Sequence, residues 1–186
     1  MLNKKVFFIK LLFAGIISGV SISFSYLIPI FFLGYYIFLT DLITHKKLKQ
    51  SFASGWIFGF GYFLGSMHWI INPFLVYEQH FILAPFALII FPTIMAFFFI
   101  IPCILITEFN RVAKLNSNYF FCKCFVISLI FFTFEYLRSF LFGGLPLNLT
   151  SHIWVFNERF ISIVSYVGVF GLSFITIFWM KDLFQP

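Results

Sequence analysis

Long apolar runs alternate with short polar breaks along the whole chain of 186 residues. A helix needs about 20 apolar residues to cross the hydrocarbon core of a bilayer, and most of these runs come close to that length or exceed it. The pattern predicts an all-α, polytopic transmembrane helix bundle that forms a single domain over residues 1–186. The six expected spans are approximately Val6–Ser23, Leu27–Ile43, Ser51–Ile71, Phe81–Thr107, Tyr119–Phe142 and Val167–Met180.

Both ends of this pattern leave an alternative open. Lys4 and Lys5 precede the first apolar run, as in a secretory signal peptide, but hydrophobicity resumes at Leu27, so a retained span is favoured. Near the other end, an amphipathic piece over Glu158–Tyr166 leads into the sixth span. These last two segments can form one long helix or two.

The composition excludes the soluble classes of protein. Hydrophobic residues make up 62% of the chain and charged residues 10%, whereas a soluble domain carries about 25% charged residues. Too few polar side chains remain to cover a surface in water, which excludes a soluble enzyme, a nucleic-acid-binding protein and a disordered tail. The 33 phenylalanines are interpreted as lipid-facing surface.

The net charge of +6 is informative about orientation, because Lys and Arg are retained in cytoplasmic loops. With the N-terminus in the cytoplasm, only Arg138 and Arg159 of the twelve basic residues lie on the outer side. The other ten lie on the inner side, which favours a cytoplasmic N-terminus: Lys4, Lys5, Lys10, Lys46, Lys47, Lys49, Arg111, Lys114, Lys123 and Lys181.

Small residues recur at steps of four along the third expected span. Gly55 and Gly59 form one pair, and Gly61 and Gly65 form another that lies about 160° around the helix from the first. Small residues at this spacing let helix backbones approach closely in lipid. The spacing predicts a central helix that packs between two neighbours, with a ligand groove as the alternative.

Two ionisable residues stand three positions apart in the fifth span. Glu135 and Arg138 share a helix face and can pair. Ionisable residues in a membrane are energetically unfavourable and mark functional sites by default. Two interpretations stay open, an interfacial structural ion pair and a polar site that faces a substrate.

The remaining reactive side chains form no recognisable catalytic or metal-binding pattern. Cys103, Cys122 and Cys124 have the spacing neither of a zinc site nor of a redox pair, and are expected to be unpaired thiols. No Ser-His-Asp set, Gly-rich phosphate loop or pair of facing carboxylates is evident. The residues alone therefore predict no catalytic residue, no metal and no cofactor.

Three stretches of the chain, taken together, resemble the apolipoprotein N-acyltransferase family. Gly55–Ile70 resembles the glycine-rich third span of that family. Phe134–Asn148, which contains Glu135, Arg138, Gly144 and Pro146, resembles its hallmark of Glu, aromatic, Leu, Arg and then Gly-aromatic-Pro-Trp. Val164–Ser173 resembles the entry to its next span. Leu145 and Leu147 depart from the hallmark, since the family has an aromatic residue and a Trp there.

The resemblance implies an enzyme of bacterial lipoprotein maturation. In the family, a periplasmic nitrilase-like domain with a Glu-Lys-Cys triad follows these spans, and its Cys carries an acyl group from a phospholipid to the diacylglyceryl-cysteine of an apolipoprotein. No residue before Pro186 matches that triad. We therefore expect a truncated or split enzyme of the bacterial inner membrane that supplies the membrane domain and is inactive alone.

The expected partners are membrane phospholipid together with an apolipoprotein substrate or a separately encoded catalytic fragment, and no nucleic acid. Two alternatives belong to other classes of function. One is a non-enzymatic membrane bundle that binds lipid or a partner protein. The other is an unrelated small transporter, although the first three spans do not echo the last three as the halves of transporters usually do.

Overall fold

The computed structural model describes residues 4–24, 27–113, 120–141, 143 and 146–180, and every regular element in those ranges is helical. The 3-10 helices η2 (His68–Leu75) and η3 (Glu78–Leu83) join α3 to α4, and η5 (Thr150–Trp154) joins α5 to α6. The chain is thus an all-α membrane bundle, as predicted. Its α-helices are α1 (Lys4–Ser23), α2 (Ile28–Thr44), α3 (Leu48–Ser66), α4 (Ala84–Ala113), α5 (Phe120–Leu141) and α6 (Glu158–Trp179).

Helix length and composition support membrane crossing for most of the bundle. Four segments of the described residues are long and apolar enough to span a bilayer, namely Val6–Ser23, Glu78–Ala113, Phe120–Leu141 and Glu158–Trp179. Helix α2 is apolar but has 17 residues, and α3 has 19 residues of which several are Gly or Ser. The count of six spans and the cytoplasmic N-terminus stay predictions.

Several expected boundaries were wrong: α3 begins at Leu48 rather than at Ser51, and α4 ends at Ala113 rather than at Thr107. Two further differences have local reasons. Helix α3 ends at Ser66 rather than at Ile71, and the ring of His68 donates from Nδ1 to the carbonyl of Gly65 at 2.9 Å. That bond satisfies one of the carbonyls that a helix end leaves without an intrahelical partner. Helix α4 begins at Ala84 rather than at Phe81, because proline is favoured in the first helical turn and Pro85 occupies it. The limits expected for the fifth span, residues 119 and 142, lie outside the described residues.

The last two expected segments form two helical pieces that meet at a kink and share the label α6. Helix α6 runs through both of them, and Gly168 inside it has φ 73° and ψ 166°. Glycine adopts this region readily because it lacks a Cβ atom. The amphipathic piece therefore continues into the apolar piece at a changed angle, which answers the question that the sequence left open.

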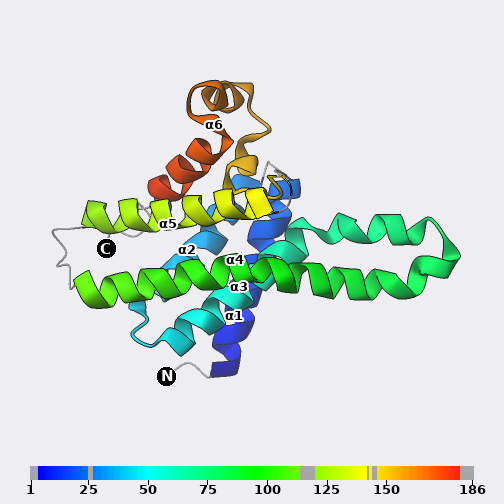
Figure 1. The fold of residues 1–186 in the computed structure, drawn as a ribbon, viewed down its shortest axis with the longest axis horizontal. Helices are drawn as coiled ribbons and strands as arrows, with labels where there is room; N and C mark the ends of the chain where they lie inside the picture. The colour runs from blue at the N-terminus through cyan, green and yellow to red at the C-terminus, as the bar shows by residue number, and fades with distance from the viewer. Residues whose placement is uncertain (1–3, 25–26, 114–119, 142, 144–145, 181–186) are drawn as a thin grey trace.

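Helix α3 lies between α1 and α4, and its two pairs of glycines face different neighbours (Figure 1). A Cβ atom added at Gly61 or Gly65 would lie 2.5 Å from a backbone oxygen of α1. One added at Gly55 or Gly59 would lie 2.9 or 2.8 Å from an atom of α4. Backbone approach this close leaves room for no side chain at any of the four positions.

Aromatic rings fill the space between α2, α3, α4 and α5. The rings of Phe38 and Phe58 stack with their centres 4.0 Å apart, and Phe99 contacts both of them. The interpretation of phenylalanine as lipid-facing surface therefore holds for residues such as Phe13 and fails for those in the core. The buried aromatic residues among the described ones are Phe31, Tyr35, Phe38, Phe58, Tyr62, Phe63, Phe99, Phe131 and, in η5, Trp154.

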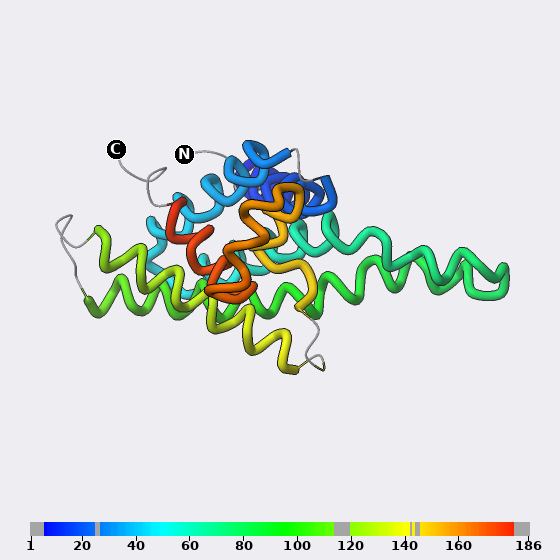
Figure 2. Tube along the Cα trace, turned by 90° about the horizontal axis from the view of Figure 1, so that it is seen from above, coloured from blue at the N-terminus to red at the C-terminus, as the bar shows by residue number. Residues whose placement is uncertain are grey.

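The bundle has two distinguishable ends. Helices η2 and η3 run back along the first half of α4, and together they extend away from the other helices (Figures 1 and 2). We call the end that contains η2, η3 and η5 the outer end, following the orientation that the basic residues predict. The inner end is the opposite one, where α2 turns into α3 and α4 terminates.

Candidate functional site

A buried polar cluster lies at the outer end of α5, centred on Glu135 and Arg138. Their exposed fractions are only 8% and 3%. Glu135 accepts two hydrogen bonds at Oε1, one from the backbone nitrogen of Thr150 at 2.9 Å and one from its hydroxyl at 2.5 Å. Arg138 donates from Nη2 to the carbonyls of Leu147 at 2.7 Å and Asn148 at 3.3 Å. Both charged side chains thus hold the segment that leads into η5.

The ion pair expected between Glu135 and Arg138 does not form in the structure. The ion pairs between described residues join His45 to Asp41 and Arg111 to Glu108. Residues three apart on a helix can pair, but the loop offers backbone groups that each charged side chain reaches instead. The Arg138 guanidinium also lies 4.9 Å from the centre of the Phe63 ring, a favourable cation–π arrangement.

Two tyrosines complete the cluster from the neighbouring helices. Tyr62 of α3 donates its hydroxyl to the carbonyl of Asn148 at 3.0 Å, and the Tyr35 hydroxyl of α2 lies 3.3 Å from that of Thr150. Asn148 itself has φ 48°, in the left-handed region that asparagine tolerates better than most residues. Side chains from α2, α3 and α5 therefore fix the path of one short loop.

Several buried polar atoms of the cluster have no hydrogen-bond partner among the described residues. They are Glu135 Oε2, Arg138 Nε, Asn148 Nδ2 and Ser151 Oγ. Buried polar groups in folded proteins are nearly always hydrogen-bonded, to protein or to ordered water. The cluster therefore keeps both donor and acceptor capacity for water or for a polar group of a bound molecule.

The other residues of the hallmark stretch lie beside this cluster. Pro146 is half-buried at the start of the segment that Arg138 binds, and Gly143 is exposed with φ 70°. Gly144 lies outside the described residues. The sequence indicated Glu135 and Arg138 but gave no sign of Tyr35 and Tyr62, which read as ordinary aromatic residues of apolar spans.

His152 of η5 belongs to the cluster, and Glu135 and Arg138 both affect its pKa. Burial lowers the pKa of His152 below its ordinary value of 6.5, the Glu135 carboxylate opposes that shift, and Arg138 adds to it. The imidazole ring of His152 therefore takes up a proton less readily in the folded protein than in the unfolded chain. The link between this segment and α6 is tight, since Trp154 donates from Nε1 to Thr176 Oγ1 at 2.8 Å.

We predict that the thermal stability of the outer end falls as the pH drops through about 6.5. A lowered pKa means that the unfolded state binds more protons, so the stabilisation is present above that pH and is lost below it. The measurement is the unfolding midpoint between about pH 7.5 and about pH 5. His152→Asn should make the unfolding midpoint depend less on pH. His68→Asn, the same change at an exposed histidine, should leave that pH dependence as in the parent.

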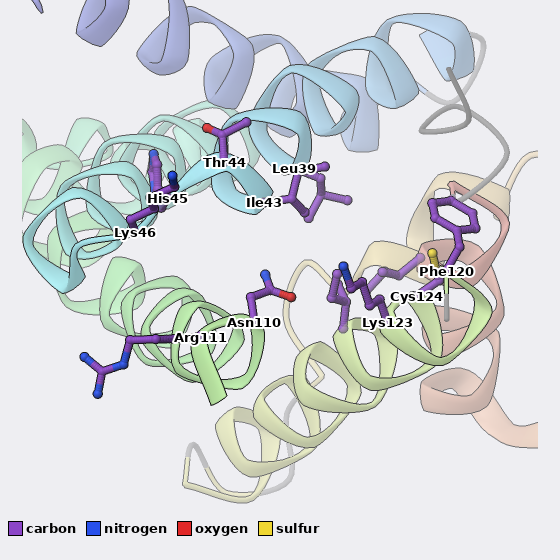
Figure 3. Close-up of a pocket in the computed structure, with 12 residues that line it drawn as sticks. Leu39, Ile43, Thr44, His45, Lys46, Asn110, Arg111, Phe120, Lys123 and Cys124 are labelled. Carbon is purple, nitrogen blue, oxygen red and sulfur yellow. The ribbon is translucent and has the colours of Figure 1, made fainter. Parts of the chain in front are cut away.

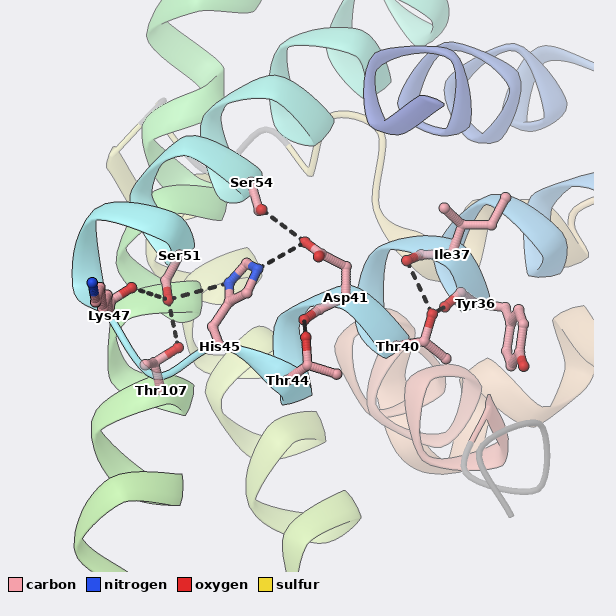
Figure 4. Close-up of polar contacts among 10 residues, drawn as sticks. All are labelled: Tyr36, Ile37, Thr40, Asp41, Thr44, His45, Lys47, Ser51, Ser54 and Thr107. Atoms are coloured by element: carbon pink, nitrogen blue, oxygen red, sulfur yellow. Dashed lines mark hydrogen bonds and ion pairs between the residues drawn. The ribbon is translucent and has the colours of Figure 1, made fainter. Parts of the chain in front are cut away.

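A second polar network joins the helices at the inner end (Figure 4). Asp41 Oδ2 lies 3.1 Å from His45 Nε2 and accepts from Ser54 at 2.7 Å. The Ser51 hydroxyl lies 3.5 Å from His45 Nδ1 and 2.6 Å from the Thr107 hydroxyl. No Ser-His-Asp set is evident in the order of residues, yet the turn between α2 and α3 brings one together. The set joins α2, α3 and α4, and the Ser51 hydroxyl is fully buried, so it is closed to a substrate even though His45 is half-buried and borders an open cleft.

The thiols and the remaining acidic and histidine side chains form no further centre. Cys103 and Cys124 are buried in α4 and α5, whereas Cys122 is exposed at the inner end of α5, and none of them is in a disulfide. In the described ranges, no group of three or more His, Cys, Asp and Glu side chains is arranged to hold a metal ion. The outer cluster is therefore the strongest candidate site.

Comparisons with known proteins match most of the chain. The model of the apolipoprotein N-acyltransferase N-terminal domain matches residues 14–180. An apolipoprotein N-acyltransferase of Rickettsia bellii is 36% identical over 180 residues, which are 96% of this chain and 34% of the relative. One of Rickettsia typhi is 37% identical over 88% of this chain and 32% of its own.

More distant relatives extend the similarity. The apolipoprotein N-acyltransferase of Sinorhizobium fredii is 28% identical over 88% of this chain. The chain spans about a third of the length of the two Rickettsia relatives. No solved structure matches the chain.

Proposed function

Because the chain belongs to the apolipoprotein N-acyltransferase family, we propose that it forms the membrane domain of such an enzyme. The outer polar cluster carries this proposal. It lies within the matched residues 14–180, and its two charged side chains are buried beside polar atoms that have no partner among the described residues. A membrane location follows from the apolar helices, and the bacterial inner membrane is the location we propose.

In the proposed reaction, the complete enzyme transfers an acyl group from a phospholipid to the amino-terminal diacylglyceryl-cysteine of an apolipoprotein. The described residues supply the support at the outer end of the membrane domain. Glu135 and Arg138 fix the loop at Asn148, and the unpaired donors and acceptors beside them can bind polar groups of a lipid or of the lipoprotein. No catalytic role is assigned to either residue.

We propose further that the 186-residue chain by itself transfers no acyl group. Covalent acyl transfer needs a nucleophile that a nearby base activates. Cys103 and Cys124 are buried within α4 and α5, and Cys122 lies at the inner end, away from the outer cluster. Catalysis in this proposal belongs to a nitrilase-like catalytic domain that acts together with this membrane domain.

A split-protein complementation experiment tests the proposal. A bacterial strain depleted of its own apolipoprotein N-acyltransferase would receive this chain, the part of the Rickettsia bellii relative that the chain does not match, or both. Mass spectrometry of a lipoprotein amino terminus reports the third acyl chain. We expect triacylated product only when both fragments are present.

Two outcomes would contradict the proposal. Product from the complementing fragment alone, in the same yield, would show that this chain contributes nothing to the reaction. Product from this chain alone, lost on Cys122→Ser, would assign the chemistry to the inner end. A matched control replaces this chain by the Arg138→Ala variant, which should lower the yield because the loop at Asn148 loses its support.

A further inference from the structure

An open cleft lies at the inner end of the bundle, far from the outer cluster (Figure 3). It has a volume of about 890 Å³ and lies between the inner ends of α2, α4, α5 and α6. Clefts of a few hundred to about 1,000 Å³ are typical of sites for small molecules. The apolar wall of the cleft is formed by Leu39, Ile43, Phe120, Ile127 and Ile177.

The opposite rim of the cleft is polar and basic. Lys46, Lys123 and Asn110 line it, and Asn110 and Lys123 project towards each other across the opening (Figure 3). Within the described residues, neither lysine forms an ion pair. The rim therefore presents two uncompensated cations and an amide beside a strip of apolar side chains.

The acidic side chains near the cleft do not cancel this charge. Asp41 is engaged by His45 and Ser54, and Glu108 pairs with Arg111 at 2.9 Å. Arg111 lines the cleft but its guanidinium points away from the opening (Figure 3). Asp41 and Glu108 are each paired with a basic side chain. The positive charges of Lys46 and Lys123 are therefore not neutralised by them.

The partial charge at a helix end favours the position of Lys46 but not that of Lys123. Lys46 follows the C-terminus of α2, where the partial negative charge of the helix end favours a cation. Lys123 lies in the first turn of α5, where the helix end is partially positive and a cation is unfavourable, and no acidic residue stands in that turn. Lys123 thus has no neutralising anion among the described residues, and a bound anion would stabilise it.

We propose that this cleft binds an anionic phospholipid of the inner leaflet, with its phosphate between Lys46, Asn110 and Lys123 and an acyl chain along the apolar wall. The inner end is where the basic residues predict the cytoplasmic surface, and anionic lipids concentrate there. A soluble phosphate compound would use the basic rim but would leave the apolar wall exposed to water. The juxtaposition of the two surfaces favours a lipid. The proposal stands apart from acyl transfer, which it does not require.

The test measures lipid binding by the chain purified in a neutral detergent. Dioctanoyl phosphatidylglycerol and dioctanoyl phosphatidylcholine are titrated in turn, and bound lipid is counted by native mass spectrometry. We expect the parent to bind phosphatidylglycerol more tightly than phosphatidylcholine. Lys46→Gln and Lys123→Gln should each weaken phosphatidylglycerol binding about fivefold, since a lysine near an anionic lipid contributes on that scale.

Lys49→Gln is the matched control, because Lys49 is exposed at the same end of the molecule and does not line the cleft. It should bind phosphatidylglycerol like the parent. Equal affinity of the parent for the two lipids, or equal weakening by Lys49→Gln and Lys123→Gln, would overturn the proposal. So would displacement of bound phosphatidylglycerol by inorganic phosphate at similar concentration, because the site would then be one for a soluble anion.

Discussion

Gly61→Leu is expected to keep α1 and α3 apart and to abolish accumulation of folded protein in the membrane. A Cβ atom at Gly61 would already lie 2.5 Å from the backbone oxygen of Leu12, and the backbone of α1 cannot rotate away as a side chain can. Overpacking a well-packed interior destabilises a protein by about 1–3 kcal/mol, and a clash with backbone should exceed that range. The measurement is the amount of protease-resistant protein in isolated membranes.

Ala53→Leu provides the control, since it places a leucine side chain on the same helix. Ala53 lines an open apolar groove on the lipid-facing side of α1, α3 and α4, where a larger side chain has room. This variant should accumulate like the parent. If Gly61→Leu accumulates equally well, α1 and α3 do not pack as closely as the structure shows.

Arg138→Ala is expected to release the loop between α5 and η5 and to lower folded yield strongly. The change removes both hydrogen bonds to the carbonyls of Leu147 and Asn148 and the contact with the Phe63 ring. Hydrogen bonds to charged groups contribute about 1.5–3 kcal/mol each, so a loss of about 3 kcal/mol or more is expected. Limited proteolysis of the loop and the thermal unfolding midpoint measure the effect.

Two variants separate this explanation from a simple loss of charge. Glu135→Gln keeps an oxygen that can accept from Thr150, so it should destabilise the protein by only about 1 kcal/mol. Arg159→Ala removes an exposed cation of α6 and should have little effect. Parent-like behaviour of Arg138→Ala would mean that the loop holds its path without the guanidinium.

The arrangement of the helices could largely be predicted from the sequence, because it depends on repeating patterns. The apolar runs indicated the helices, and the steps of four between Gly55, Gly59, Gly61 and Gly65 indicated where α3 carries no side-chain bulk. Such features are local and periodic, so they are visible in the order of residues. The 3-10 segments were not predicted, since they depend on single contacts such as that of His68 with Gly65.

The site could be predicted only in part, because its contacts join residues far apart in the chain. Helical spacing placed Glu135 and Arg138 on one face and suggested that they bind each other. It could not show that Thr150 and Asn148 return to the same place, or that Tyr35 and Tyr62 approach from two other helices. The inner Asp41, His45 and Ser51 escaped notice for the same reason, since a turn between helices brings them together.

The central position of α3 has a consequence for how the nascent chain enters the bilayer. Its two flanking helices, α1 and α4, are both complete by Ala113, before any of α5 has been synthesised. Phe63 and Tyr62 are then already positioned when Glu135 and Arg138 leave the ribosome. We expect this early assembly to lower the energetic barrier to inserting two ionisable side chains into lipid, since the incoming helix meets the Phe63 ring and the Tyr62 hydroxyl rather than lipid alone.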